Sequence, residues 1–216
     1  MDLAVITLDT VTTLLLLLLI GLGPKIALVP FLEKSKNFPP EVQRAIGRRM
    51  VITAVSAAVI VFLTGALLLK LLHITPGAVA AAGGIILALL AVRMALGKGD
   101  EVEHEVTIPT DPLKLAVYPL AVPYLFNPVG ITVLIIASEA AGSLAASALV
   151  LGLVLLVGAL DYLIFSNIDK VAKRVNPTSL VVSEIVFGVL LTAVAVQLFV
   201  YGLGLLGVLE PNVTPH

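Results

Sequence analysis

The sequence contains no cysteine and little charge. With no cysteine among 216 residues, disulfide frameworks, thiolate metal sites and cysteine nucleophiles are excluded. Charged residues make up 12% of the chain, whereas a soluble domain carries about 25%. The net charge of −1 gives no basic excess to hold a polyanion, so we expect no nucleic-acid partner. An ordinary soluble enzyme and a nucleic-acid binder are therefore both excluded.

Apolar residues dominate instead, at 59% of the chain. A bilayer-spanning helix needs about 20 consecutive apolar residues. Windows of that kind predict an all-α polytopic membrane protein with six transmembrane helices, surrounded by lipid. The predicted spans are roughly 8–32, 50–72, 77–97, 114–138, 143–166 and 179–206.

The basic residues predict the orientation of these spans. A secretory signal peptide begins with a basic region, but the first basic residue here is Lys25, so we expect an uncleaved first span. Loops one, three and five carry eleven basic residues, against the single Lys70 on the other face. This bias predicts that those loops are cytoplasmic and that both termini lie outside the cell membrane. The eleven are Lys34, Lys36, Arg44, Arg48, Arg49, Arg93, Lys98, Lys114, Lys170, Lys173 and Arg174.

Three spans that start outside, followed by three that start inside, have the layout of two inverted-topology three-helix repeats. The segment 84–93 resembles 188–197 at an offset of 104 residues, and the same offset carries Pro24 onto Pro128. The expected division is a first repeat over 1–97, a cytoplasmic acidic linker over 98–113 and a second repeat over 114–216.

Helices 1 and 4 are expected to be broken, at Pro24 and at Asn127-Pro128. Proline inside a helix removes a hydrogen bond and clashes with the preceding turn, at a cost of about 3 kcal/mol. One interpretation is a pair of packing kinks. The other is a substrate site, because paired Gly/Pro interruptions in the two halves of a transporter indicate where the substrate binds.

At these residues the chain resembles the MarC family, which includes archaeal transporters of small neutral amino acids. The likeness covers all six spans and depends on the order and spacing of short apolar motifs. These are Pro24 with Ala27-Leu28-Val29-Pro30-Phe31, Ala81-Ala82-Gly83-Gly84 to Arg93-Met94, Pro119 to Pro123 with Asn127-Pro128-Val129-Gly130, and Val196-Gln197 with Gly202. The resemblance implies transport of glycine, alanine or similar substrates, coupled to a proton or cation gradient.

We expect alternating access by rocking of the two repeats about a fixed site, with the substrate held at the two broken helices. A broken helix could recognise a zwitterionic amino acid through its backbone. Free amides at the start of the second half-helix favour an anion, whereas stranded carbonyls at the end of the first half-helix suit an ammonium group. We expect these amides at 25–27 and 129–131, and these carbonyls at 20–21 and 124–125. The candidate substrate-binding residues are Gly21, Gly23, Pro24, Lys25, Ile26, Tyr124, Asn127, Pro128, Gly130 and Thr132.

Two of these side chains are open to alternative interpretations. Asn127 either contacts the substrate or only caps the second half-helix, and it can do both. Lys25 would cost about 2.5–3.5 kcal/mol at the centre of a span. It therefore either extends to the membrane surface or faces the cavity as the partner of a carboxylate.

Coupling needs a titratable group or a cation cage, and the candidates are Glu184 and Asp161. The histidines fall in loops or the tail without ligand-like spacing, so we expect no metal site and no cofactor. No H-E-x-x-H or G-x-S-x-G motif is present, so we do not expect an enzyme. An exporter of another small metabolite and a non-transporting regulatory subunit remain alternatives. The sequence does not determine the oligomeric state, the coupling ion or the direction of transport.

Overall fold

The structure is a computed structural model that describes residues 7–96, 111–168, 170 and 177–209. These residues form helices and connections, with no strand among them. The predicted linker over 98–113 lies mostly outside the described residues. The elements are α1 (Leu8–Gly21), α2 (Pro24–Ser35), α3 (Pro40–Leu72), α4 (Pro76–Ala95), α5 (Leu113–Leu115), η1 (Ala116–Leu125), α6 (Pro128–Ala140), α7 (Leu144–Ser166) and α9 (Pro177–Leu205).

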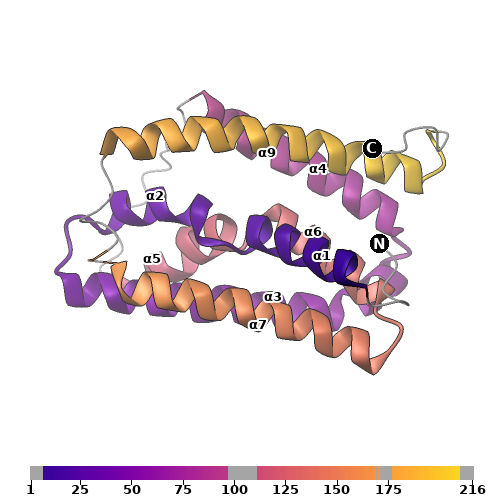
Figure 1. The fold of residues 1–216 in the computed structure, drawn as a ribbon, viewed down its shortest axis with the longest axis horizontal. Helices are drawn as coiled ribbons and strands as arrows, with labels where there is room; N and C mark the ends of the chain where they lie inside the picture. Colours follow the sequence, from indigo (N-terminus) through magenta and orange to yellow (C-terminus); the bar gives the residue numbers. More distant parts are fainter. Residues whose placement is uncertain (1–6, 97–110, 169, 171–176, 210–216) are drawn as a thin grey trace.

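The helices lie in three layers (Figure 1). Helices α4 and α9 pack along one another on one side, and α3 and α7 do so on the opposite side. Helices α1, α2, η1 and α6 lie between these pairs. There α1 contacts α6, and α2 contacts η1. Most of the buried core residues lie where the middle layer packs against α3 and α7.

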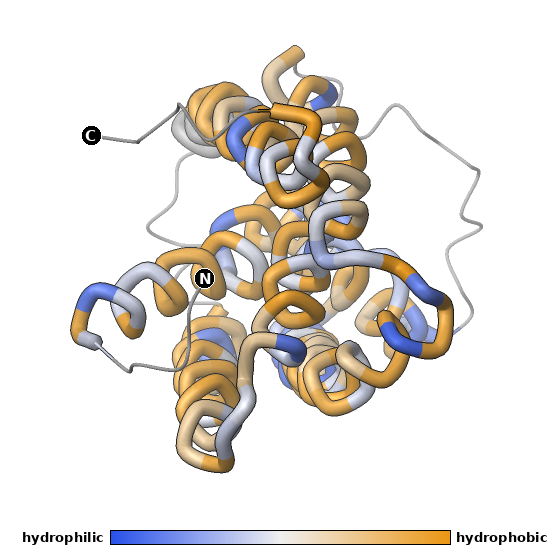
Figure 2. Tube along the Cα trace, turned by 90° about the vertical axis from the view of Figure 1, so that its right-hand side faces the viewer, coloured by the Kyte–Doolittle hydropathy of each residue, from blue (hydrophilic) through white to orange (hydrophobic). Residues whose placement is uncertain are grey.

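Among the described residues, five helical segments are long and apolar enough to cross a membrane. The number rises to six if Leu113–Leu125 and Pro128–Ala140, which meet at 69°, form one span. Large apolar side chains face outward along these helices, including Leu67 on α3 and Leu89 on α4, each 65% exposed. Figure 2 shows this hydrophobic character on the outer helices. Exposed apolar surface on this scale indicates contact with lipid, as predicted for a polytopic α-helical membrane protein.

Helix α3 begins at Pro40, ten residues before the predicted span. The predicted span begins only after Arg49, because Arg44, Arg48 and Arg49 interrupt the apolar pattern, but the helix includes all three residues. Proline is favoured at a first helical position because its missing amide has no partner there in any case. The apolar pattern therefore marks the part of α3 suited to hydrocarbon, and the polar first turns extend beyond it.

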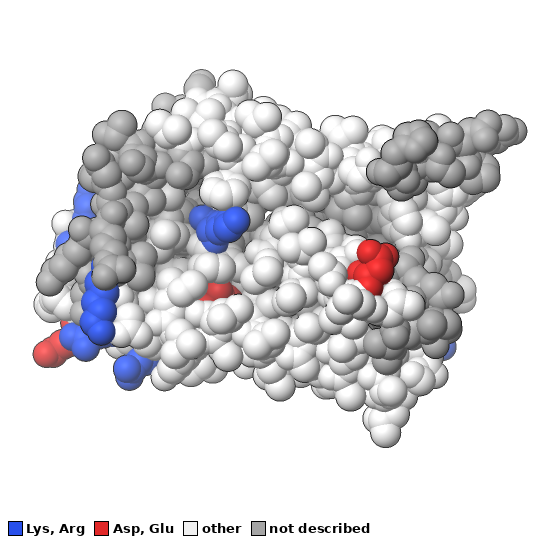
Figure 3. Space-filling model, in the orientation of Figure 1, with Lys and Arg blue, Asp and Glu red and all other residues white. Residues whose placement is uncertain are grey.

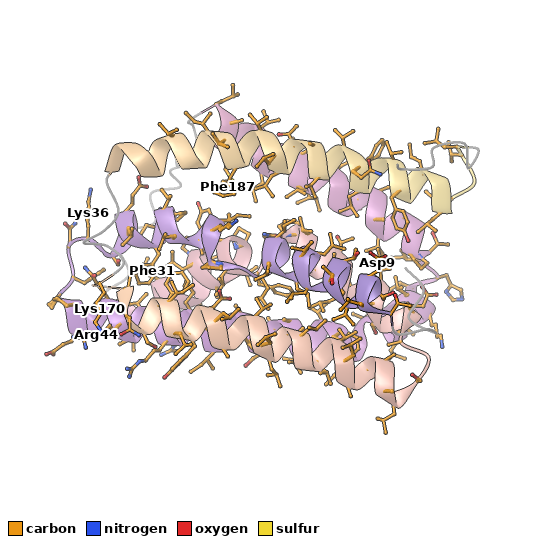
Figure 4. All side chains as sticks on the ribbon, viewed as in Figure 1. Asp9, Phe31, Lys36, Arg44, Lys170 and Phe187 are labelled. Carbon is orange, nitrogen blue, oxygen red and sulfur yellow. The ribbon has the colours of Figure 1, made fainter. Side chains whose placement is uncertain are left out.

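Basic side chains gather at one end of the bundle, which we call the basic end (Figure 3). Lys36, Arg44 and Lys170 lie at this end, where α2 ends and α3 begins (Figure 4). Asp9 lies toward the opposite end, in the first turn of α1. Helix α9 also finishes at that opposite end.

Small residues hold α4 and α9 close together. A Cβ atom on Gly84 would lie 2.8 Å from the carbonyl oxygen of Ala195 and 2.7 Å from the amide nitrogen of Phe199. A Cβ atom on Gly188 would lie 2.9 Å from the carbonyl oxygen of Ala91. Small residues at helix interfaces let backbones approach within a membrane. The pair therefore packs backbone to backbone and forms one unit.

We expect Gly84→Leu to destabilise the protein by about 1–3 kcal/mol or more, because overpacking a tight contact has that cost. The new side chain would have to displace the α9 backbone rather than a flexible side chain. Thermal unfolding in detergent micelles measures the effect. Gly152→Leu is the matched control, because a Cβ atom on Gly152 meets nothing within 4 Å. Equal losses in the two variants would contradict the close packing of α4 on α9.

Candidate functional site

The first helix break lies between α1 and α2. Helix α1 ends at Gly21, and the amide of Leu22 closes its last turn by donating to the Leu18 carbonyl at 2.7 Å. Gly23 has extended backbone with φ −93° and ψ 163°, and Pro24 opens α2. Glycine at this N-cap position supplies no side-chain acceptor, so the first amides of α2 receive no cap of that kind.

The second break lies between η1 and α6. Within η1, Tyr118 and Val122 have extended backbone, and the peptide bonds to Pro119 and Pro123 are cis. Asn127 is the N-cap of α6, with φ −92° and ψ 172°, and Pro128 is the first residue of that helix.

Asn127 joins the two breaks. Its side-chain amide donates to the Ile20 carbonyl at 2.7 Å, and its backbone amide donates to the Gly21 carbonyl at 2.9 Å. Its Oδ1 accepts the amides of Val129 at 2.9 Å and of Gly130 at 3.3 Å. The side chain is completely buried. Asn127 therefore caps α6 and also ties it to the end of α1.

Backbone contacts reinforce this junction. A Cβ atom on Gly21 would overlap the Cα atom of Gly130, and one on Gly130 would overlap the Gly21 carbonyl oxygen. Glycine at both positions allows the two chains to approach this closely. The breaks are thus in direct contact with one another.

This geometry corrects the expectation that both breaks offer free backbone groups to a ligand. The carbonyls of Ile20 and Gly21 each accept a hydrogen bond from Asn127. The amides of Val129 and Gly130 donate to Asn127 Oδ1, and the amide of Ile131 donates to the backbone carbonyl of Asn127 at 3.1 Å. The expectation was wrong for α6, because its asparagine cap satisfies the groups that a ligand would use. The first turn of α2 has no equivalent cap.

A cavity of about 500 Å³ borders the first turn of α2. It lies between α1, α2, α7 and α9, and its lining is almost entirely apolar. The lining residues are Leu16, Leu19, Ile20, Pro24, Lys25, Ile26, Leu160, Ile164, Phe187, Leu190, Leu191 and Val194.

Lys25 places a charge in this apolar cavity. Its Nζ lies 4.9 Å from the centroid of the Phe187 ring, close enough for a cation–π interaction. Figure 4 shows Phe187 on α9, on the side of that helix facing the middle layer. Lys25 is among the residues that line the cavity, and its side chain is exposed, so both positions considered for it stay predictions. The sequence did not identify Phe187, because no spacing rule brings α9 to the start of α2.

The remaining candidate residues divide between the cavity and the protein interior. Pro128 and Thr132 line a separate groove of about 660 Å³ between α4 and α6, in which the Thr132 hydroxyl contacts Gly83. Tyr124, in η1, is partly buried and has an interaction partner. The candidate site residues thus do not converge on one cavity. Only Pro24, Lys25 and Ile26 border the cavity of about 500 Å³.

The two coupling candidates lie on different helices. Glu184 is in α9, and its side chain is outside the described ones. Asp161 is in α7, where it is completely buried. The described residues contain no group of three or more His, Cys, Asp or Glu side chains that could hold a metal ion.

Comparisons with known proteins agree with this architecture. The model of the MarC family integral membrane protein matches residues 8–206. A UPF0056 membrane protein of Methanocaldococcus jannaschii is 28% identical over 184 residues, covering 84% of this chain and 90% of its own. A second, from Pyrococcus horikoshii, is 26% identical over 178 residues, covering 80% and 84%. No solved structure gives a significant match to this chain. The chain therefore belongs to the MarC family of integral membrane proteins.

Proposed function

We propose that the protein is a secondary transporter that moves small neutral amino acids such as glycine and alanine by alternating access. The observation that carries this proposal is the charged cavity beside the first helix break. Lys25 supplies an ammonium group there, and the first turn of α2 supplies amides without a side-chain cap. Both favour the carboxylate of a zwitterionic substrate.

The substrate's ammonium group needs an acceptor near the same place. Ile20 lines the cavity, and its carbonyl oxygen accepts one hydrogen bond from Asn127. A carbonyl oxygen has two lone pairs, so a second donor can bind to it. In this proposal the substrate bridges the end of α1 and the start of α2, rather than the two breaks.

Two inverted repeats are part of the proposal, and the 104-residue offset supports them. Pro24 and Pro128 are both first residues of a helix. Gly84 contacts Ala195 and Phe199, whereas Gly188 contacts Ala91 and Ala95. Adding 104 to the numbers 84, 91 and 95 gives 188, 195 and 199. The same contacts therefore occur in both directions across the α4–α9 pair, as expected for two halves related by a pseudo-two-fold axis.

The moving units in this proposal are not the repeats themselves. Helix α4 of the first repeat packs along α9 of the second, and α1 of the first is tied to α6 of the second. A motion that separated the repeats would break both contacts. We therefore propose that the α4–α9 pair moves against the remaining helices, which changes the access to the cavity between α9 and α2.

We further propose that the basic end faces the cytoplasm and that both termini lie outside the cell membrane. The basic side chains of the α2–α3 connection and Lys170 lie together at this end. Positively charged loops remain in the cytoplasm during insertion. A proton or a cation gradient would drive the transport.

Ligand-dependent thermal stabilisation of the purified protein tests the substrate class. We expect glycine and alanine to raise the melting temperature, because a ligand that binds only the folded state stabilises it. Glycine amide, which lacks the carboxylate, should have no effect. The cavity of about 500 Å³ exceeds what glycine needs, so leucine is included. Stabilisation by leucine but not by glycine or alanine would contradict the small-substrate proposal, as would equal stabilisation by glycine and glycine amide.

Single cysteines report whether the cavity holds water, because the native chain has no cysteine to interfere. We expect Ile164→Cys, which lines the cavity and is partly buried, to react with a water-soluble maleimide and to be protected by glycine. The reactive species is the thiolate, which forms only where water reaches the thiol. Leu89→Cys is the control, because Leu89 is 65% exposed but outside the cavity lining and is expected to face lipid. Equal labelling of the two cysteines, unaffected by glycine, would contradict a hydrated binding cavity.

A further inference from the structure

Asp161 is a buried carboxyl group without a hydrogen-bond partner. It lies in α7, the span Leu144–Ser166, and its side chain is 0% exposed. Neither Oδ1 nor Oδ2 has a hydrogen-bond partner among the described residues. An ionised carboxylate in an apolar interior requires donors or a cation, and a buried polar group without a partner calls for an explanation.

The buried residues of α3 that neighbour Asp161 are apolar. Phe165 packs against Gly47, and Gly158 packs against Val55, so the two helices run antiparallel. The α3 turns between these contacts therefore lie beside Asp161, and their buried residues are Met50, Val51 and Ala54. A metal cation would need several oxygen ligands, which these side chains do not supply.

The turn that carries Asp161 also lies beside the proposed substrate cavity. Leu160 and Ile164 line that cavity together with the first turn of α2. By the helical rotation of 100° per residue, Asp161 lies between Ile164 and Phe165 around α7, toward the buried side of the helix. Asp161 is thus next to the cavity wall but not part of the lining.

The ionisable groups around Asp161 are few. On α7 itself the only other one is Tyr162, and the guanidinium carbon of Arg48 on α3 lies 6.0 Å from its ring centroid. Helix α2 contributes Lys25, which borders the cavity, and Glu33 and Lys34 near its C-terminal end. Helix α1 contributes Asp9, in its first turn at the opposite end of the molecule. The described side chains of α9 include none with a charge.

The other unpartnered buried oxygens lie nearer the basic end. They are the hydroxyls of Ser35, the last residue of α2, and Ser166, the last residue of α7. Ser166 is about 7.5 Å further along the helix axis than Asp161, at 1.5 Å per residue. Water satisfies buried polar groups of this kind, and it would bring exchangeable protons near Asp161.

We propose that Asp161 is a proton-binding site inside the bundle, and that its proton is the ion coupled to transport. The second part rests on the proposed transport function, whereas the first does not. Protonation makes the carboxyl neutral, so it needs no cation partner in apolar surroundings. Burying the ionised carboxylate costs more free energy than burying the neutral acid. Binding of a proton can therefore shift the equilibrium between two packings of α7 beside the cavity.

Carbodiimide labelling tests the proton site independently of transport. Dicyclohexylcarbodiimide is apolar and reacts with protonated carboxyl groups, so we expect an adduct at Asp161 in the full-length protein in lipid nanodiscs. Peptide mass spectrometry locates the adduct, and its yield should fall as pH rises. Asp161→Asn should lose this adduct, whereas Asp9→Asn should retain it. No adduct at Asp161 at any pH, or a yield independent of pH, would overturn the proposal.

Transport measurements then test the coupling. We expect liposomes that contain the Asp161→Asn variant to exchange internal for external glycine but to lose the accumulation driven by a proton gradient. The Asp161→Glu variant should restore part of that accumulation. Full proton-driven accumulation by Asp161→Asn would overturn the coupling role. If the wild-type protein labels at Asp161 but exchanges no amino acid, the proposed function fails, the coupling role falls with it, and the proton site remains.

Discussion

Replacing Asn127 by alanine is expected to lower the free energy of unfolding by about 1.5–5 kcal/mol. Loss of an asparagine N-cap costs about 0.5–2 kcal/mol. The substitution also leaves the buried Ile20 carbonyl without its donor, which adds about 1–3 kcal/mol. Chemical or thermal unfolding in micelles measures the sum.

Asn167→Ala is the matched control for this experiment. Asn167 is exposed, and its side-chain amide makes one local hydrogen bond, 2.9 Å to the Leu163 carbonyl. Its replacement should change stability by less than about 1 kcal/mol, because the freed carbonyl is solvated. Similar losses for Asn127→Ala and Asn167→Ala would show that Asn127 does not join the two breaks.

Replacing Lys25 by methionine is expected to reduce transport by about 10–100-fold. A hydrogen bond to a charged group contributes about 1.5–3 kcal/mol, and each 1.4 kcal/mol corresponds to a factor of ten in affinity. The same substitution should leave stability unchanged or raise it, because a lysine near the centre of a span is costly to insert. Transport and stability are thus expected to change in opposite directions.

Two further variants separate the charge of Lys25 from its position. Lys25→Arg keeps a cation beside Phe187 and should retain more transport than Lys25→Met. Lys36→Met removes an exposed charge at the basic end and should leave transport unchanged. Normal uptake by Lys25→Met would exclude Lys25 from substrate recognition.

The apolar pattern predicted the membrane helices because hydrocarbon imposes one requirement on every span. The predicted windows overlap the helices in the structure, including α7 at Leu144–Ser166 against the predicted 143–166. The pattern could not locate the start of α3, where a helix continues through charged residues. Hydropathy identifies the segment that is apolar enough to lie in lipid, and a helix can extend past the ends of that segment.

The candidate site was less predictable, because its geometry depends on tertiary contacts. The sequence identified Asn127 beside a proline and offered capping as one role. It could not reveal that the same amide reaches Ile20, 107 residues away, and donates to one of the carbonyls expected to bind a ligand. Nor could it place Phe187 against Lys25. The local sequence predicts which backbone amides and carbonyls lose their helical hydrogen bonds at a break. Tertiary packing determines which of those groups find another partner.

Counterflow in proteoliposomes tests most directly whether the cavity at Lys25 serves amino-acid transport. Vesicles are loaded with unlabelled glycine and diluted into a trace of labelled glycine, so no ion gradient is needed. We predict transient accumulation of label with the wild-type protein, and accumulation close to that of protein-free vesicles with Lys25→Met. Wild-type vesicles that accumulate neither glycine nor alanine above protein-free vesicles would contradict the account.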